Sequence, residues 1–128
     1  PGNPKTPKRV FGRTYQDISN LPEDIARFWL EAQTRTPEVA RQGQRLLVSL
    51  HARDLLAVEP ALARLQVPTL IVWGTDDIFF RPKWAYWLRD AIAGATEVVE
   101  IDGGRLFFPD ERATELTEAL RRHWDAHP

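Results

Sequence analysis

The chain contains no cysteine and no methionine, and its longest apolar runs are only a few residues. Without cysteine there is no disulfide framework, no thiolate metal site and no thiol nucleophile, which is compatible with the cytoplasmic location that we expect. The short apolar runs argue against a membrane-spanning helix. Only three histidines occur and they are scattered, so we predict no metal site.

What the chain does have is the length of one domain, 128 residues, with 43% apolar and 27% charged residues. Fourteen of the seventeen basic residues are arginine, and they are interleaved with acids, which argues against a nucleic-acid-binding face. The one local basic excess, PKTPKRVFGR at 4–13, is rich in proline, and we interpret it as a solvated connector. Because the chain opens without methionine, we expect an internal or processed start.

The first half predicts two amphipathic helices. Pro22 suits the first turn of one helix, whose inward face follows the i, i+3, i+4, i+7 spacing: Ile25, Phe28, Trp29 and Ala32. The second helix begins with Thr36 as cap and Pro37 at its first position. Its apolar side is expected to consist of Val39, Gly43, Leu46, Leu47 and Leu50. A short third segment, 59–65, leads into a strand.

The second half predicts a strand, a helix, a parallel strand and a final helix. TLIVW (69–73) is apolar throughout, as expected of a strand buried on both faces, and TEVVEI (96–101) is the second strand. The helix between them, from Pro82 to about residue 93, should bury Trp84, Trp87, Leu88 and Ala91. The final helix should begin with Asp110 as cap and bury Ala113, Leu116, Leu120 and Trp124.

Two parallel strands leave exposed edges and do not normally form a sheet by themselves. We therefore infer that a missing N-terminal half or another chain is needed to complete the sheet.

Two carboxylates follow the first strand. Asp76 and Asp77 come after Gly74, so at least one of them should stand at the carboxyl edge of the sheet, where open α/β proteins place their chemistry. A fixed, partly buried acid there could orient a catalytic histidine. The alternative is that the pair forms a turn and caps backbone amides.

The stretch PTLIVWGTDDIFF, followed by a helix, EVVEIDGG, an aromatic loop and DERA, resembles the C-terminal part of the α/β-hydrolase superfamily. The resemblance is to the capped branch that contains epoxide hydrolases, haloalkane dehalogenases and related esterases. It implies an α/β fold in which residues 58–128 supply the last two parallel strands with their flanking helices, and residues 1–57 form a connector and the remnant of a helical cap. By this resemblance Asp77 matches the acid of the family, with Asp76 as the alternative acid.

The resemblance also locates a missing base. The family loop after the last strand usually reads G-x-G-H-F, and aligning Gly103 with its first glycine and Phe107 with its phenylalanine puts Leu106 at the histidine position. Leucine cannot accept a proton, so general-base activation of water is not available there. If another histidine substitutes, His51 is the candidate, although a surface position three residues before Asp54 is the simpler interpretation.

The nucleophile of the family stands on a G-x-S-x-G or G-x-D-x-G elbow, ahead of the acid in chain order. Ser19 and Ser49, the only serines, lack flanking glycines and are interpreted as a helix-start and a helix-face residue. The elbow would therefore lie upstream of Pro1. His123 is expected to decorate the end of the last helix, and His127 is expected in the frayed tail after it.

Aromatic residues crowd the segment after the acid. By the resemblance, Phe79 and Phe80 are candidates to bind substrate, and Phe107 is a third candidate beside the missing base. Tyr86 is expected at the surface.

Two hypotheses follow. In the first, the parent protein is a cofactor-independent hydrolase that cleaves ester, epoxide or carbon–halogen bonds in small apolar substrates, and this chain contributes its acid. In the second, turnover has been lost and the fold binds a ligand or a partner protein.

Overall fold

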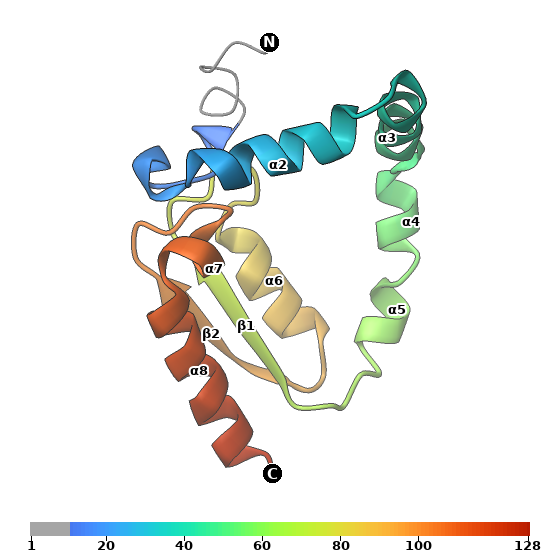
Figure 1. Cartoon of the computed structure of the whole chain (residues 1–128). Coiled ribbons are helices and arrows are strands. Elements are labelled where there is room, and N and C mark those ends of the chain that lie inside the picture. Colours follow the sequence, from blue (N-terminus) through green and yellow to red (C-terminus); the bar gives the residue numbers. More distant parts are fainter. Residues whose placement is uncertain (1–10) are drawn as a thin grey trace.

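The structure is a computed structural model that describes residues 11–128, so most of the predicted connector at 4–13 lies outside the described residues. It contains helices and two parallel strands (Figure 1). In chain order the elements are η1 (Ile18–Asn20), α2 (Glu23–Thr34), α3 (Pro37–Ser49), α4 (Ala52–Leu56), α5 (Glu59–Leu62), β1 (Thr69–Gly74), α6 (Lys83–Ala91), β2 (Ala95–Ile101), α7 (Phe108–Glu111) and α8 (Ala113–Ala126).

The predicted strand–helix–strand unit is confirmed. β1 pairs with β2 in parallel from Thr69 opposite Ala95 to Gly74 opposite Ile101, with one irregularity in register after Thr69. In Figure 1 the two strands lie between α6 and α8. The larger buried cluster joins β1, α6 and β2 through Ile71, Ala85, Ile92 and Ala95, with Leu62, Trp73, Leu88 and Val98 packed against it.

A second buried cluster joins the start of the described chain to the loop after β2. Tyr15, Leu21 and Ala26 form its centre, and Phe11, Ile18, Trp29 and Phe107 pack around them. Because Phe107 is about ninety positions further along the chain than the others, this cluster ties the first described segment to the carboxyl end of the sheet.

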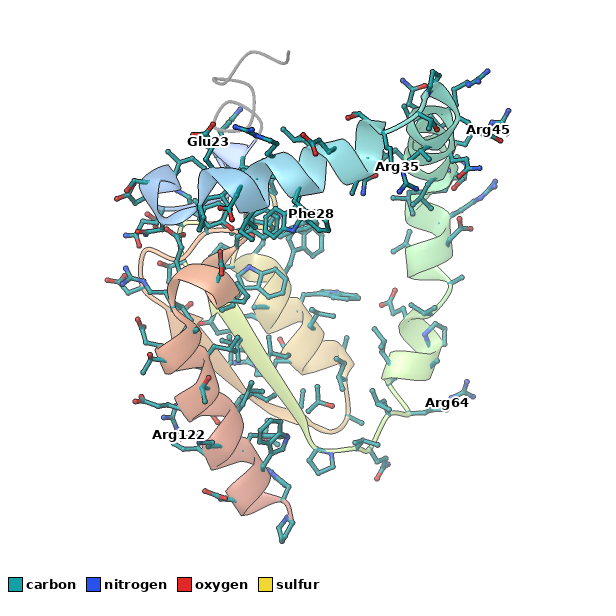
Figure 2. All side chains as sticks on the ribbon, viewed as in Figure 1. Glu23, Phe28, Arg35, Arg45, Arg64 and Arg122 are labelled. Carbon is teal, nitrogen blue, oxygen red and sulfur yellow. The ribbon has the colours of Figure 1, made fainter. Side chains whose placement is uncertain are left out.

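Helices α3, α4 and α5 form an arm that leaves the end of α2 and returns to β1 at its amino end (Figure 1). The predicted start of α3 is confirmed, since the Thr36 hydroxyl accepts the Val39 N–H at 3.2 Å and Pro37 follows it. Arg45 on α3 and Arg64, just after α5, point outward (Figure 2). The polar side of the arm is therefore solvated.

The predicted apolar faces of α2 and α3 are largely wrong. On α2, Ile25 and Phe28 are 40% and 66% exposed, and Ala26 is buried in their place. On α3, the three leucines of the predicted face are exposed: Leu46, Leu47 and Leu50. The physical reason is that α3 packs on α2, and its partly buried residues (Val39, Ala40 and Gly43) lie in its first half, whereas residues 44–50 are exposed.

The tryptophans of α6 were also predicted inward and lie outward. Ala85 is completely buried against the sheet, whereas Trp84 and Trp87 are 47% and 37% exposed and pack edge to face with ring centroids 6.2 Å apart. The small side chain at position 85 lets α6 approach the strands closely, which turns the adjacent large rings to the outside.

The final helix is divided in two. α7 ends at Glu111, Arg112 has non-helical backbone angles (φ −121°, ψ 38°), and α8 then begins at Ala113. Asp110 is therefore not the cap of the long helix. Within α8 the buried residue is Ala119, while Leu116 and Leu120 are half-buried and the predicted inward residues Ala113 and Trp124 are exposed.

Candidate functional site

The carboxyl ends of β1 and β2 are joined by a close backbone contact. Asp76 N–H donates to the Gly104 carbonyl at 3.0 Å, and Gly103 N–H donates to the Thr75 hydroxyl at 2.8 Å. A Cβ atom on Gly74 would overlap the carbonyl of Gly104. Gly103 has a φ of 68°, which favours glycine. The paired glycines therefore hold the loop after β2 directly against the loop that carries the two aspartates.

Asp77 is buried, with 9% of its surface exposed. Its Oδ1 atom accepts the N–H of Phe79 at 2.8 Å and the N–H of Phe80 at 3.0 Å. The turn-capping role is thus present, and it also fixes the carboxylate at the edge of the sheet. Asp76, the alternative acid, has an exposed side chain. Of the two carboxylates, Asp77 has the burial and the fixed position that an orienting acid requires.

The segment after Asp77 presents apolar side chains to solvent. Ile78, Phe79 and Phe80 are 47%, 51% and 53% exposed. Their backbone is held by the two bonds to Asp77 and by the Trp73 indole N–H, which donates to the Phe80 carbonyl at 2.8 Å. A rigid turn therefore displays an apolar surface next to the buried acid, and contact of Phe79 and Phe80 with substrate stays a prediction.

The loop predicted to carry the base is held from the other side by residues 14 and 15. The Arg105 guanidinium donates to the Tyr15 carbonyl at 3.1 Å, and Phe107 N–H donates to the Thr14 carbonyl at 2.9 Å. Leu106, between them, is half-buried. Neither Arg105 nor Leu106 is an ordinary proton acceptor, so these two positions offer no general base.

Phe107, the third substrate-binding candidate, lies among other aromatic rings. Its centroid is 5.4 Å from Tyr15, 5.9 Å from Trp29 and 6.3 Å from Phe11. These contacts assign the ring a packing role in the second buried cluster, and its contact with substrate is untested.

Glu111 and Arg112 form hydrogen bonds to residues 16–20 that the sequence did not predict. Glu111 accepts three of them, from the N–H groups of Gln16 and Asp17 at 2.7 and 2.9 Å and from the Asn20 amide at 3.1 Å. Arg112 donates to the Gln16 side chain at 2.6 Å. The only signal in the sequence was a cluster of charged residues at the expected start of a helix, where capping is the simpler explanation.

Tyr15 completes this fastening. Its ring is fully buried and its hydroxyl donates to Asp110 Oδ2 at 2.7 Å. Burial raises the pKa of the phenol above its ordinary value, and the hydrogen bond to Asp110 and the negative charges of Asp110 and Glu111 raise it further. The Asp110 carboxylate thus accepts a hydrogen bond from the Tyr15 hydroxyl instead of capping a helix.

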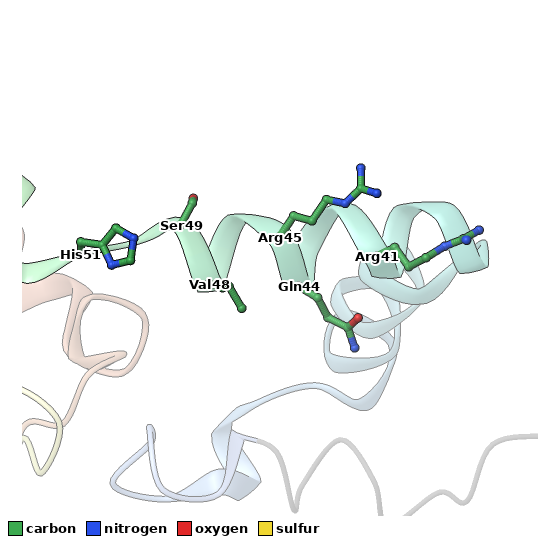
Figure 3. Close-up of a pocket in the computed structure, with 6 residues that line it drawn as sticks. All are labelled: Arg41, Gln44, Arg45, Val48, Ser49 and His51. Carbon is green, nitrogen blue, oxygen red and sulfur yellow. The ribbon is translucent and has the colours of Figure 1, made fainter.

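The histidines do not lie with the acid. Both hydrogen bonds that Asp77 Oδ1 accepts come from backbone amides, and no histidine side chain is bonded to Asp77 within residues 11–128. His51 is exposed and borders an open hollow of about 500 Å³ along α3, lined also by Arg41, Gln44, Arg45, Val48 and Ser49 (Figure 3). His123 and His127 stack with centroids 4.6 Å apart at the end of α8. Within the described residues no hydrogen bond joins His51 to Asp77, and the stand-in role of His51 stays a prediction.

The described part of the chain holds no group of three or more His, Asp or Glu side chains that could bind a metal ion. Within the same residues, no helix has the length and apolar character needed to cross a membrane. The fold and site define a mixed α/β protein with a buried acid at the carboxyl edge of two parallel strands. Comparison with protein-family models, with curated proteins and with solved structures finds no match for the chain.

Proposed function

We propose that this chain is the C-terminal portion of a capped α/β hydrolase whose parent cleaves ester, epoxide or carbon–halogen bonds of small apolar substrates without a cofactor. The observation that carries the proposal is the position of Asp77. Its carboxylate is buried and fixed at the carboxyl end of β1, and Asp76 beside it is hydrogen-bonded to the Gly103–Gly104 turn in which the family places its base.

In this role Asp77 is a positioning residue for an imidazole, which another part of the parent must supply because position 106 is leucine. A carboxylate that is held by backbone amides cannot rotate freely, so it can fix the tautomer of a histidine and stabilise the imidazolium that forms when the histidine takes a proton. The exposed Phe79 and Phe80 would form an apolar wall for the substrate. The nucleophile would come from polypeptide outside the present sequence, because neither Ser19 nor Ser49 has an elbow around it.

The test begins by sequencing the coding DNA upstream of the Pro1 codon and expressing the resulting parent. An extension with a G-x-S-x-G elbow predicts esterase chemistry, and one with G-x-D-x-G predicts epoxide or carbon–halogen cleavage. In the active parent, Asp77→Asn should lower kcat by about a thousandfold or more, since the asparagine keeps the turn but lacks the charge. Asp76→Asn is the matched control and should retain activity. Undiminished turnover by Asp77→Asn would refute the role.

A second candidate function rests on a different observation. Leu106 stands where the base belongs, and its neighbours Arg105 and Phe107 are bonded to residues 14 and 15. These features favour a protein that keeps the fold and binds a ligand or partner without turnover. Robust activity of the unmodified parent eliminates this candidate. Activity that appears only in Leu106→His supports it.

An intermediate outcome is also measurable. A parent with a G-x-D-x-G elbow but no base would stall after its first step, because the ionised aspartate displaces halide directly and forms an ester that needs base-activated water for its hydrolysis. Intact mass spectrometry after exposure to a haloalkane would show this persistent ester adduct, and Leu106→His should shorten its lifetime.

A further inference from the structure

The first described segment is bonded to the loop after β2 at several successive residues. Tyr15 is held at two points, since its carbonyl accepts from Arg105 and its hydroxyl donates to Asp110. The N–H of Phe107 donates to the neighbouring carbonyl, that of Thr14, at 2.9 Å. The residues that follow Tyr15 are bonded to the charged pair that follows Asp110. Because the bonded residues are consecutive on both sides, the two segments cannot separate at one point without straining the neighbouring bonds.

Helix α2 depends on the same region for its position. Its extensive contacts with other helices and strands are with α3, and not with β1, β2, α6 or α8. Ala26 is buried in the second cluster, and the ring centroid of Trp29 is 5.9 Å from that of Phe107. In Figure 1 α2 lies beyond the carboxyl ends of the two strands. Packing on Phe107 and on residues 11–21 is therefore what holds α2 against the rest of the fold.

The other end of the arm is attached separately. Leu62 packs against the larger buried cluster, and the Gly94 N–H donates to the Leu65 carbonyl at 2.7 Å. A Cβ atom on Gly94 would overlap the Val67 carbonyl, so the two backbones are in close contact there. The arm therefore has two attachments of different kinds, a backbone contact before β1 and the packing of α2 on the loop after β2.

We propose that residues 11–21 and 105–112 form a latch that opens as one unit and releases the α2 end of the arm, while the end at residues 62–65 stays fixed. The latch is the weaker attachment because most of its side-chain hydrogen bonds are exposed to solvent, and such regions open at a lower free energy than packed backbone. Position 106 lies inside the latch, so the arm and the site loop are released together. This inference goes beyond the proposed hydrolase function and does not depend on it.

Native-state hydrogen exchange of the 128-residue chain tests whether the latch opens as one unit. Tyr15→Phe removes the hydrogen bond to Asp110 and keeps the buried ring. The reporters are the amides of Gln16, Asp17 and Phe107, none of which is bonded to the lost hydroxyl. All three should exchange faster by one common factor of about ten, the effect of losing one hydrogen bond to a charged group.

The limits of the latch are measured in the same experiment. The amide of Gly94, at the fixed end of the arm, and that of Gly103, which donates to a hydroxyl in the loop after β1, should exchange at unchanged rates. Tyr86→Phe is the matched control, because it removes a tyrosine–carboxylate bond of 2.9 Å to Glu100 outside the latch. It should leave the three reporter amides unchanged.

A second variant tests whether α2 belongs to the unit. Trp29→Leu removes the ring contact with Phe107 and should accelerate exchange of the same three reporter amides by a common factor of about three or more. Trp84→Leu is its control, since that ring pairs with Trp87 on α6 and not with the latch.

Several results would overturn the proposal. They are unchanged exchange in Tyr15→Phe, different factors at the three reporter amides, an equal acceleration at Gly94 and Gly103, and an equal response to Tyr86→Phe. Unchanged reporter amides in Trp29→Leu would also overturn it, because α2 would then not be released with the latch.

Discussion

Replacing Glu111 with alanine should release the first described segment from the loop after β2. The Glu111 carboxylate accepts three hydrogen bonds, all from residues 16–20. A hydrogen bond to a charged group contributes about 1.5–3 kcal/mol when it is shielded, but these three are solvent-exposed, so we take about 0.7 kcal/mol for each. Their loss should then lower the free energy of local opening by about 2 kcal/mol, which corresponds to roughly thirtyfold faster hydrogen exchange through that opening.

Native-state hydrogen exchange of the Gln16 and Asp17 amides measures this effect directly, because both amides donate to Glu111. Glu118→Ala is the control, since it removes the same charge from an exposed position on α8. The exchange rates in Glu111→Gln should lie between those of Glu111→Ala and Glu118→Ala, because glutamine keeps an acceptor oxygen but loses the charge. Unchanged exchange at residues 16 and 17, or an equal change throughout β1 and β2, would refute a local fastening role.

Three further predictions concern other positions. The pKa values of Tyr15 and Tyr86 are both raised in the fold, so their contribution to the free energy of unfolding should be fully present below pH 10, the ordinary tyrosine pKa, and should be lost as the pH rises above it. Phenolate absorbance should therefore appear at higher pH in the folded chain than in the chain unfolded in urea. Gly74→Ala should destabilise by about 3 kcal/mol in chemical denaturation, while Gly43→Ala, whose Cβ meets nothing closer than 3.7 Å in a helix, should stabilise by about 0.5–1 kcal/mol. Asp77→Asn should melt within about 3 °C of the unmodified chain, whereas Asp77→Ala should melt clearly lower because it loses both amide bonds.

The parts of the fold that could be predicted from sequence are those governed by local physics. Continuous apolar β-rich residues gave β1, and the Thr36–Pro37 pair gave the start of α3, because strand propensity and helix capping act within a few residues. The position of Asp77 followed in the same way, from an apolar strand closed by glycine.

The inward faces of the helices could not be predicted with equal success, because they depend on what each helix meets. Leu46 and Leu47 share an apolar stripe that would be buried in an ordinary domain, yet they are 63% and 70% exposed where no described element covers α3. The fate of Asp110 shows the same limit, since its partner Tyr15 is 95 positions away in the chain. Periodicity and capping rules carry no information about contacts at that separation.

The loop after β2 contains two separate constraints, and they explain how its paired glycines can occur without a base at position 106. Gly103 and Gly104 are required by the close contact between the ends of the two strands, whatever side chain follows them. Arg105 and Glu111 are occupied in holding the segment 15–20. Neither constraint fixes the chemistry at position 106, so the paired glycines by themselves do not indicate catalysis. The substitution Asp77→Asn therefore tests whether this side chain does more than cap the turn, because capping needs only its oxygen, whereas orienting an imidazolium needs a carboxylate.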